Sequence, residues 1–254
     1  MSKTRLDVAL VERGLAETRA AAQRLVMAGL VFTGERRLDK PGHAVAADLP
    51  LEVRGQPHPY VSRGGLKLER GLDHFAIPVA GRVALDVGAS TGGFTDLLLQ
   101  RGATKVYAVD VGTNQLAWKL RQDPRVVSME RTNMRDVTPA EIAQPVDLVV
   151  CDASFIGLRT VLPAALALAA PGAHLVALIK PQFEVGRGRV GKGGIVRDPD
   201  LHREVCDTIV EWLGQQPGWQ VLGLADSPIE GADGNREFLV AAQFRPDAVS
   251  APPG

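Results

Sequence analysis

The chain has 254 residues, 45% of them hydrophobic, which is enough for one large domain and a small second one. Lysine plus arginine and aspartate plus glutamate number 29 each, so a global electrostatic field for a polyanion is excluded and nucleic acid would need local basic patches. No apolar run approaches the roughly 20 residues that span a bilayer, and no signal peptide is recognisable. Cys151 and Cys206 lack metal-ligand spacing and fit a reducing cytosol, so a cytoplasmic, metal-free protein off the membrane is predicted.

Residues 1–55 predict a small α+β domain. A first helix is expected over residues 5–14, with Gly14 as its stop. A second helix follows Thr18, whose hydroxyl can cap it, and ends at Gly29. Short strands are predicted at residues 30–34, 44–46 and 51–53.

Basic residues recur in this small domain, and charge alone leaves a solvated surface and an RNA-binding surface equally open. The pattern Thr-Arg-x-x-Ala-x-x-Leu-Val-x-x-Gly-x-Val at residues 18–31, with its flanks, resembles the RNA-binding domain named after small-subunit ribosomal protein S-four. The resemblance covers roughly residues 3–52. In that family the second helix and the following turn carry basic side chains to RNA phosphates. The resemblance implies RNA contacts from Arg5, Arg19, Arg24, Arg36 and Arg37.

A linker is predicted at residues 56–62, because the prolines in and around it exclude a helix. Residues 63–73 then predict a short helix that begins beside two glycines. Its first residue, Arg63, is a further candidate RNA contact. Lys67, taken alone, is equally well explained as a solvated helix lysine.

Strands and helices alternate from Gly81 onward, within a large domain predicted at residues 63–248 and followed by a disordered tail at 249–254. Near-continuous apolar strands argue for a parallel sheet covered on both faces. The last two strands are joined by a loop, so an antiparallel hairpin is expected there. This arrangement resembles the α/β class I methyltransferase fold, which is Rossmann-like with a seven-stranded, mostly parallel sheet. The predicted strands are 82–87, 105–110, 126–130, 146–151, 173–180, 220–225 and 237–244, and the helices are 114–121, 158–169 and 199–213.

A glycine-rich turn follows the first of these strands, at residues 84–96. A dinucleotide fingerprint needs Gly-x-Gly-x-x-Gly, but Ser90 stands where its second glycine would be. The pattern Asp-x-Gly-x-x-x-Gly-Gly resembles instead the loop that binds S-adenosylmethionine. The candidate cofactor-binding residues of this turn are Asp86, Gly88, Ser90, Thr91, Gly92, Gly93 and Phe94.

Three further residues are candidates for binding the same cofactor. Asp110 ends the next strand, and a carboxylate there can accept two hydrogen bonds from a ribose diol. A helix cap is the alternative role for Asp110. Asn133 and Met134 follow the third strand, where related enzymes hold the adenine, although Asn133 is equally suited to a turn.

Four polar residues are candidates for the chemistry. Asp152 and Lys180 follow parallel strands at the edge where ligands collect, and Glu237 begins an antiparallel strand at that edge. Lys67 has to be brought there by the linker, which the sequence does not demonstrate. The order Lys67, Asp152, Lys180, Glu237 resembles the tetrad of FtsJ-like ribose 2′-O-methyltransferases, with Asp152 also beside the cofactor.

The tetrad suits proton removal from a ribose hydroxyl, which is a poor nucleophile until its proton is withdrawn. Free lysine has a pKa near about 10.4. A second cation and burial lower a lysine's pKa, whereas nearby carboxylates raise it, and the sequence does not decide the balance. Lys180 is assigned as the general base. Lys67 would perturb it or position the ribose, and Asp152 and Glu237 would orient the lysines.

Five separated motifs look like the TlyA family, whose members join an S-four-type domain to an FtsJ-like domain and are often labelled haemolysin A. The resemblance covers residues 3–245. It implies methylation of cytidine 2′-hydroxyls in ribosomal RNA, with S-adenosylmethionine as cofactor and ribosomal RNA or subunits as partners. The target nucleotide, the subunit and the oligomeric state stay open. The motifs are Tyr60–Lys67, Asp86–Asp96, Cys151–Ile156, Ile179–Glu184 and Ser227–Glu237.

The sequence is less consistent with two other function classes. An RNA-binding ribosome-assembly factor would hold the cofactor without catalysis, but an intact tetrad argues against it. A membrane-active cytolysin needs an insertion segment, and the most apolar helix is short and interrupted by Pro163.

A basic, glycine-rich stretch at residues 183–197 leaves two interpretations open. It is either a disordered surface loop or a lid that grips the RNA backbone near the active site. In the second interpretation, Arg187, Arg189 and Lys192 contact phosphates.

Overall fold

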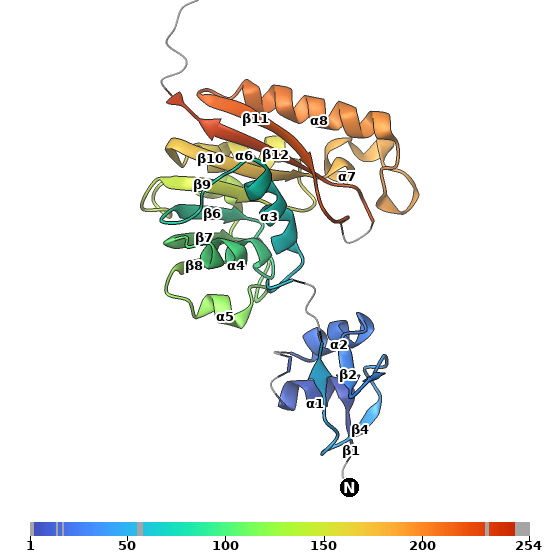
Figure 1. The fold of residues 1–254 in the computed structure, drawn as a ribbon. Helices are drawn as coiled ribbons and strands as arrows, with labels where there is room; N and C mark the ends of the chain where they lie inside the picture. Colours follow the sequence, from blue (N-terminus) through green and yellow to red (C-terminus); the bar gives the residue numbers. More distant parts are fainter. Residues whose placement is uncertain (1–2, 14, 17, 55–57, 232–233, 247–254) are drawn as a thin grey trace, which may run out of the picture. The chain divides into compact units, whose positions relative to one another are not determined.

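The computed structural model describes residues 3–13, 15–16, 18–54, 58–231 and 234–246 (Figure 1). The chain divides into two compact units, residues 1–59 and 60–254. Gly14, residues 55–57 of the linker region and the predicted tail at 249–254 lie outside the described residues. Each unit is described by itself below.

The N-terminal unit combines two helices with two small antiparallel sheets. Strand β1 pairs with β4, and β2 lies between β3 and β5. Thr18 Oγ1 accepts a hydrogen bond from Ala21 N at 3.1 Å, which confirms the predicted helix cap. Strands β1 and β3 were not predicted, because each has only two or three residues and lacks an apolar pattern. The elements are β1 (Lys3–Arg5), α1 (Leu6–Glu12), α2 (Arg19–Met27), β2 (Val31–Thr33), β3 (Arg36–Arg37), β4 (Ala44–Ala46) and β5 (Glu52–Val53).

A buried carboxylate organises the two helices of this unit. Asp7 is fully buried and accepts hydrogen bonds from Arg5 Nη2 at 2.9 Å, Arg19 Nε at 2.9 Å and Gln23 Nε2 at 2.8 Å. The Arg5 guanidinium holds the pKa of Asp7 well below its usual range, and Gln23 and Arg19 add to the effect. Arg5 and Arg19, expected to contact RNA, both pair with Asp7 but keep 49% and 56% of their side chains exposed, and Arg24, Arg36 and Arg37 are exposed as well.

Replacing Asp7 by asparagine is expected to destabilise the N-terminal unit by about 1–3 kcal/mol, because charged hydrogen bonds to a buried group are lost. The folded-state pKa of Asp7 is lowered, so its contribution is present above the unfolded value of about 3.9 and is lost as pH falls below it. Hydrogen exchange of α1 and α2 between pH 3 and pH 7 measures this. Asp39→Asn, an exposed acid of the same unit, is the control. Equal protection in wild type and Asp7→Asn would contradict the assignment.

The larger unit is built on one seven-stranded sheet with the order β11-β12-β10-β9-β6-β7-β8. Strands β6 to β10 are parallel, and β12 inserts antiparallel between β10 and β11. This confirms the predicted α/β fold, with its mostly parallel sheet and final hairpin. The strands are β6 (Val83–Val87), β7 (Lys105–Val109), β8 (Val126–Met129), β9 (Val146–Cys151), β10 (Ala169–Ile179), β11 (Trp219–Asp226) and β12 (Phe238–Phe244).

Helices cover both faces of the sheet (Figure 1). Alternate strand residues point to opposite faces, so Leu85 and Val87 pack with α6 and α8 while Ala84 packs with α3 and α4. None of the helices among the described residues combines the length and apolar character that crossing a bilayer requires. The helices are α3 (Gly64–His74), α4 (Gly93–Gln100), α5 (Trp118–Arg121), α6 (Leu158–Leu166), α7 (Pro181–Glu184) and α8 (Pro199–Gly214), with 3-10 turns η1 (Met134–Asp136), η2 (Arg187–Arg189) and η3 (Lys192–Gly194).

The helix predicted at residues 114–121 was too long, since only α5 at its end forms. The Glu130 carboxylate accepts hydrogen bonds from the backbone N–H groups of Asn114 at 2.8 Å and Gln115 at 3.1 Å. Asn114 also has a positive φ of 54°, which a helix does not tolerate. The segment before α5 is therefore a loop shaped by Glu130.

Candidate active site

The turn after β6 has a backbone that only small residues can adopt. Gly88 has φ 80°, and a Cβ there would lie 2.8 Å from Ala153 Cα. Gly92 has φ 98°, and a Cβ would lie 2.3 Å from a side-chain carbon of Leu120. Ser90 also takes a positive φ, 48°, and its backbone N–H donates to Asp110 Oδ2 at 2.8 Å. The chain therefore bends sharply and stays close to the segment that follows β9.

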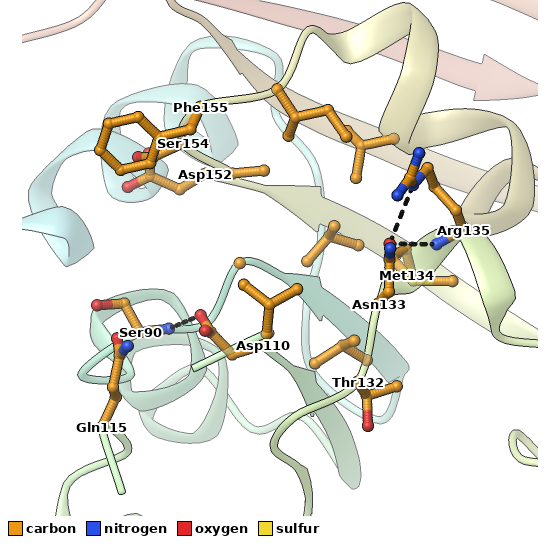
Figure 2. Close-up of a pocket in the computed structure, with 17 residues that line it drawn as sticks. Ser90, Asp110, Gln115, Thr132, Asn133, Met134, Arg135, Asp152, Ser154 and Phe155 are labelled. Atoms are coloured by element: carbon orange, nitrogen blue, oxygen red, sulfur yellow. Dashed lines mark hydrogen bonds between the residues drawn. The ribbon is translucent and has the colours of Figure 1, made fainter. Parts of the chain in front are cut away.

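A cavity of about 440 Å³ opens beside this turn (Figure 2). Six of the predicted cofactor residues line it: Gly88, Ser90, Asp110, Asn133, Met134 and Asp152. The other five do not line it: Asp86, Thr91, Gly92, Gly93 and Phe94. Of these, Phe94 is buried in the core, where it supports the turn by packing. The cavity is therefore formed by the ends of four neighbouring strands, β6 to β9.

Asp110 and Asn133 organise the wall of the cavity as well as lining it. Asp110 accepts hydrogen bonds from Ser90 N and, through Oδ1, from Gly112 N at 2.7 Å, so it fixes two turns and is not a helix cap. Each carboxylate oxygen keeps a second lone pair that can accept a ligand hydroxyl. Asn133 Oδ1 accepts from both N and Nε of Arg135 at 3.2 Å, which is the turn-forming role left open above (Figure 2).

Asp86 is a buried carboxylate with one oxygen unsatisfied. Its Oδ2 accepts a hydrogen bond from Thr95 Oγ1 at 2.7 Å, but its Oδ1 has no hydrogen-bond partner among the residues that the structure describes. Burial raises the pKa of Asp86 to about 7. A buried acceptor without a donor is unfavourable, so this position favours a ligand that brings a donor or a positive charge.

The four predicted catalytic residues are brought together by the fold. Lys67 Nζ lies 2.6 Å from Glu237 Oε2 and 3.9 Å from Asp152 Oδ2, and Lys180 Nζ lies 2.6 Å from Asp152 Oδ1. Lys67, Lys180 and Glu237 are buried, and the Asp152 side chain keeps 20% exposure. The charges alternate along the chain of contacts Glu237–Lys67–Asp152–Lys180. Asp152 also lines the cavity, so the tetrad meets the cavity there.

Ser154 and Phe155, which follow Asp152 in the chain, were not predicted from the sequence to belong to the site. Ser154 Oγ accepts a hydrogen bond from Lys180 Nζ at 3.0 Å, beside a 3.1 Å bond from the same nitrogen to the Asp152 carbonyl. Phe155 lines the cavity, is 91% exposed and has a φ of 65°, a strained backbone for an aromatic residue. An exposed aromatic face is a surface on which nucleobases stack. The only sequence signal was their place in the Cys151–Ile156 motif.

The candidate RNA contacts of this unit differ in their surroundings. Arg63 is exposed and donates from Nη2 to the Glu230 carbonyl at 2.9 Å. Arg189 pairs with Glu204, with Nη2 to Oε2 at 2.6 Å. The side chains of Arg187 and Lys192 lie outside the described part of the structure. Of these four candidates, Arg189 is thus already held by an acid of α8.

Comparisons with known proteins extend over both units. Residues 60–244 match the FtsJ-like methyltransferase family, and residues 4–48 match the S4 domain. The chain is 56% identical to a candidate rRNA methyltransferase, YqxC, from Bacillus subtilis, covering 94% of this chain and 85% of that one. It is 49% identical to the 16S/23S rRNA (cytidine-2'-O)-methyltransferase TlyA of Mycobacterium tuberculosis, covering 98% and 93%. A solved structure described as a candidate hemolysin from Streptococcus thermophilus shares 47% identity, with a TM-score of 0.73 and coverage of 96% and 90%.

Proposed function

Because the chain belongs to the FtsJ-like methyltransferase family and resembles TlyA over nearly its full length, we propose that it methylates the 2′-hydroxyl of a cytidine in ribosomal RNA. Its cofactor is S-adenosylmethionine. One observation carries the proposal of 2′-hydroxyl chemistry. The buried chain Glu237–Lys67–Asp152–Lys180 meets the cofactor cavity at Asp152, where a bound hydroxyl would lie between base and methyl donor.

The residues of the cavity fit this cofactor. S-adenosylmethionine carries an ammonium group, a ribose diol and an adenine, and when bound it supplies an electrophilic methyl group. The spare lone pairs of Asp110 suit the diol. Asp86 does not line the cavity, but it lies one residue before the end of β6, behind the turn, and its unsatisfied Oδ1 would accept a hydrogen bond from the ammonium if the turn yields to the cofactor. Met134 and Asn133 offer an apolar wall and a polar edge for the adenine.

This assignment makes cofactor affinity depend on pH. Asp86 has a raised pKa of about 7, so acidification protonates it and removes the charge that would hold the ammonium. The Kd for S-adenosylmethionine is expected to rise about tenfold between pH 7 and pH 5.5. Titration calorimetry at four pH values measures this, and Asp86→Asn should bind weakly at every pH.

The pH dependence of thermal stability tests the raised pKa of Asp86 independently of cofactor binding. The raised pKa means that the stabilising effect of the protonated form is complete below the unfolded value of about 3.9 and is lost as pH rises through 7. Without cofactor, Asp86→Asn should therefore melt above the wild type at pH 8. A pH-independent affinity in the wild type would exclude this role for Asp86.

In the proposed mechanism, Lys180 acts as the general base. Neutral Lys180 would keep two N–H donors for Ser154 Oγ and the Asp152 carbonyl. Its third position now faces Asp152 Oδ1 at 2.6 Å, so the 2′-hydroxyl would take the place of that oxygen and meet the lone pair of the amine there. The proton of the 2′-hydroxyl would move to Lys180 Nζ, and the Asp152 carboxylate, 2.6 Å away, would stabilise the ammonium that forms. Lys67, held by Glu237, places a second positive charge beside Asp152 and the reacting oxygen.

The N-terminal unit would supply affinity for RNA. Arg24, Arg36 and Arg37 are exposed, and such side chains bind phosphates without reading sequence. Arg5 and Arg19 would support this surface indirectly, through Asp7.

The proposal is tested by mapping ribose methylation on both ribosomal RNAs after incubating purified, unmethylated subunits with the protein and S-adenosylmethionine. We expect a new 2′-O-methylcytidine on at least one subunit. Naked RNA in a parallel reaction establishes whether the assembled particle is needed. Tight binding to subunits without methyl transfer to either RNA would refute the proposal and favour a ribosome-assembly factor.

A further inference from the structure

The basic, glycine-rich segment at residues 186–195 is a loop between two buried valines. Val185 and Val196 both belong to the hydrophobic core, so the two ends of the loop are fixed by packing. Between them, Gly186, Gly193 and Gly194 have φ values of 78°, 78° and 79°, and a Cβ at any of the three would meet nothing within 4 Å. The loop therefore has open space at these three glycines, whereas Val190 packs partly against the core and Arg189 pairs with Glu204.

Two buried polar side chains hold the end of this loop. Asn235 is only 1% exposed; its Oδ1 accepts a hydrogen bond from Val196 N at 3.0 Å, and its Nδ2 donates to the Gly194 carbonyl at 3.0 Å. His202 of α8 is also buried, and its Nε2 donates to the Val196 carbonyl at 2.9 Å. The backbone from Gly194 to Val196 is thus hydrogen-bonded by side chains of two distant segments.

The same asparagine belongs to the segment that carries a tetrad residue. The Asn235 carbonyl accepts a hydrogen bond from Gly231 N at 2.9 Å, and a Cβ on Gly231 would lie 2.6 Å from Glu237 Oε1. Glu237 follows Asn235 by two residues and pairs with Lys67 at 2.6 Å. At its other end the loop begins six residues after Lys180. Both ends of the loop are therefore connected to the tetrad, one by the chain and one through Asn235.

We propose that Asn235 is a positioning residue that fixes the loop at residues 186–195 relative to Glu237. In this way the RNA backbone bound by the loop is held in register with the tetrad. The proposal rests on the proposed function, because it assigns the loop to the RNA substrate. It requires that the loop contribute to binding of RNA and not of the cofactor. Leaving aside the side chains of Arg187 and Lys192, which the structure does not describe, no residue of the loop lines the cofactor cavity.

The test compares Asn235→Ala with His202→Gln, which weakens the second anchor and keeps every hydrogen bond of Asn235, although it also removes the ring that packs against Phe238 with centroids 5.5 Å apart. The control is Gln220→Ala, an exposed side chain on β11. Three quantities are measured on the full-length protein: the rate of tryptic cleavage after Arg187, Arg189 and Lys192, the KM and kcat for ribosomal subunits, and the Kd for S-adenosylmethionine.

We expect cleavage in the loop to be about tenfold faster in both variants and the KM for subunits to rise about tenfold, because buried hydrogen bonds to the loop are lost. The Kd for S-adenosylmethionine should stay within twofold of the wild type. In Asn235→Ala alone, kcat should also fall, because Glu237 loses its neighbouring support. Asn235→Asp, which keeps the acceptor for Val196 N, should recover part of the KM.

Two results would overturn the proposal. One is cleavage and KM within twofold of the wild type in both variants. The other is a parallel loss of cofactor affinity and melting temperature in Asn235→Ala, with no rescue by Asn235→Asp, which would mark a merely structural residue. If the wild type transfers no methyl group, the proposed function fails by itself, and the cleavage rates with subunit-binding affinity still decide the role of Asn235.

Discussion

Replacing Lys180 by alanine is expected to lower the single-turnover rate of methyl transfer to ribosomal RNA by about 10³-fold. A positioned general base contributes about 10²–10⁴ in rate, and removal of Lys180 leaves no amine bonded to Ser154 and the Asp152 carbonyl. The Kd for S-adenosylmethionine should change little, because Lys180 does not line the cofactor cavity. Transfer of a labelled methyl group with enzyme in excess measures the chemical step without product release.

The variant Lys180→Arg distinguishes a role of Lys180 as proton acceptor from a role of its positive charge. A guanidinium keeps the positive charge beside Asp152 but stays protonated, so it does not accept a proton. We therefore expect Lys180→Arg to be about as slow as Lys180→Ala. Lys105→Ala, at the opposite end of the strands, is the matched control and should leave the rate unchanged. An Arg variant with wild-type activity would show that Lys180 acts through its charge and would exclude the base.

Gly88→Ala is expected to weaken binding of S-adenosylmethionine by more than about 100-fold. The new Cβ would lie 2.8 Å from Ala153 Cα and 2.9 Å from Ala153 N, so the clash is with backbone and no rotamer relieves it. The φ of 80° adds strain for any residue with a Cβ. The two costs together are about 2–6 kcal/mol. Relief would push the turn after β6 away from the segment that carries Asp152.

Gly172 provides a matched control that has the strain of a positive φ without the steric clash. Gly172 has a similar φ of 83°, but a Cβ there would meet nothing within 4 Å. Gly172→Ala should therefore show the strain of a positive φ as a lower melting temperature, while calorimetry should give an unchanged Kd for the cofactor. A Gly88→Ala protein that binds S-adenosylmethionine within threefold of the wild type would contradict the geometry of the turn.

The position of Lys67 illustrates what the sequence left open. In the sequence, Lys67 reads equally well as a solvated helix lysine. In the structure, Leu68 and Leu72 of α3 pack in the same core cluster as Leu97 and Leu98 of α4. A Cβ on Gly65 would lie 2.4 Å from the Tyr60 ring, so the start of α3 is held closely against the residues before it. This packing turns Lys67 inward, toward Glu237 and Asp152.

Asp7 of the N-terminal unit is a second residue whose surroundings the sequence left open. Arg5 and Arg19 stay about half exposed, as expected, but both guanidiniums also bond the buried Asp7 carboxylate. Asp7 has no pattern that marks it as buried, since an acid in the first turn of a helix is usually solvated and favourable there. Burial of a charge depends on neighbours from other segments, which a local pattern does not contain.

Side-chain periodicity and the steric demands of glycine act over a few neighbouring residues, so the seven strands, the final hairpin and the glycine-rich turn could be predicted from the sequence. Asp152, Lys180 and Glu237 were predicted by their place at strand ends and Lys67 by the family resemblance, and their catalytic roles stay predictions. The unsatisfied oxygen of Asp86, the exposed ring of Phe155 and the hydrogen bonds of Asn235 to the basic loop could not be predicted in this way. Each of these depends on distances and burial among residues far apart in the chain, and such quantities arise only when the core has packed.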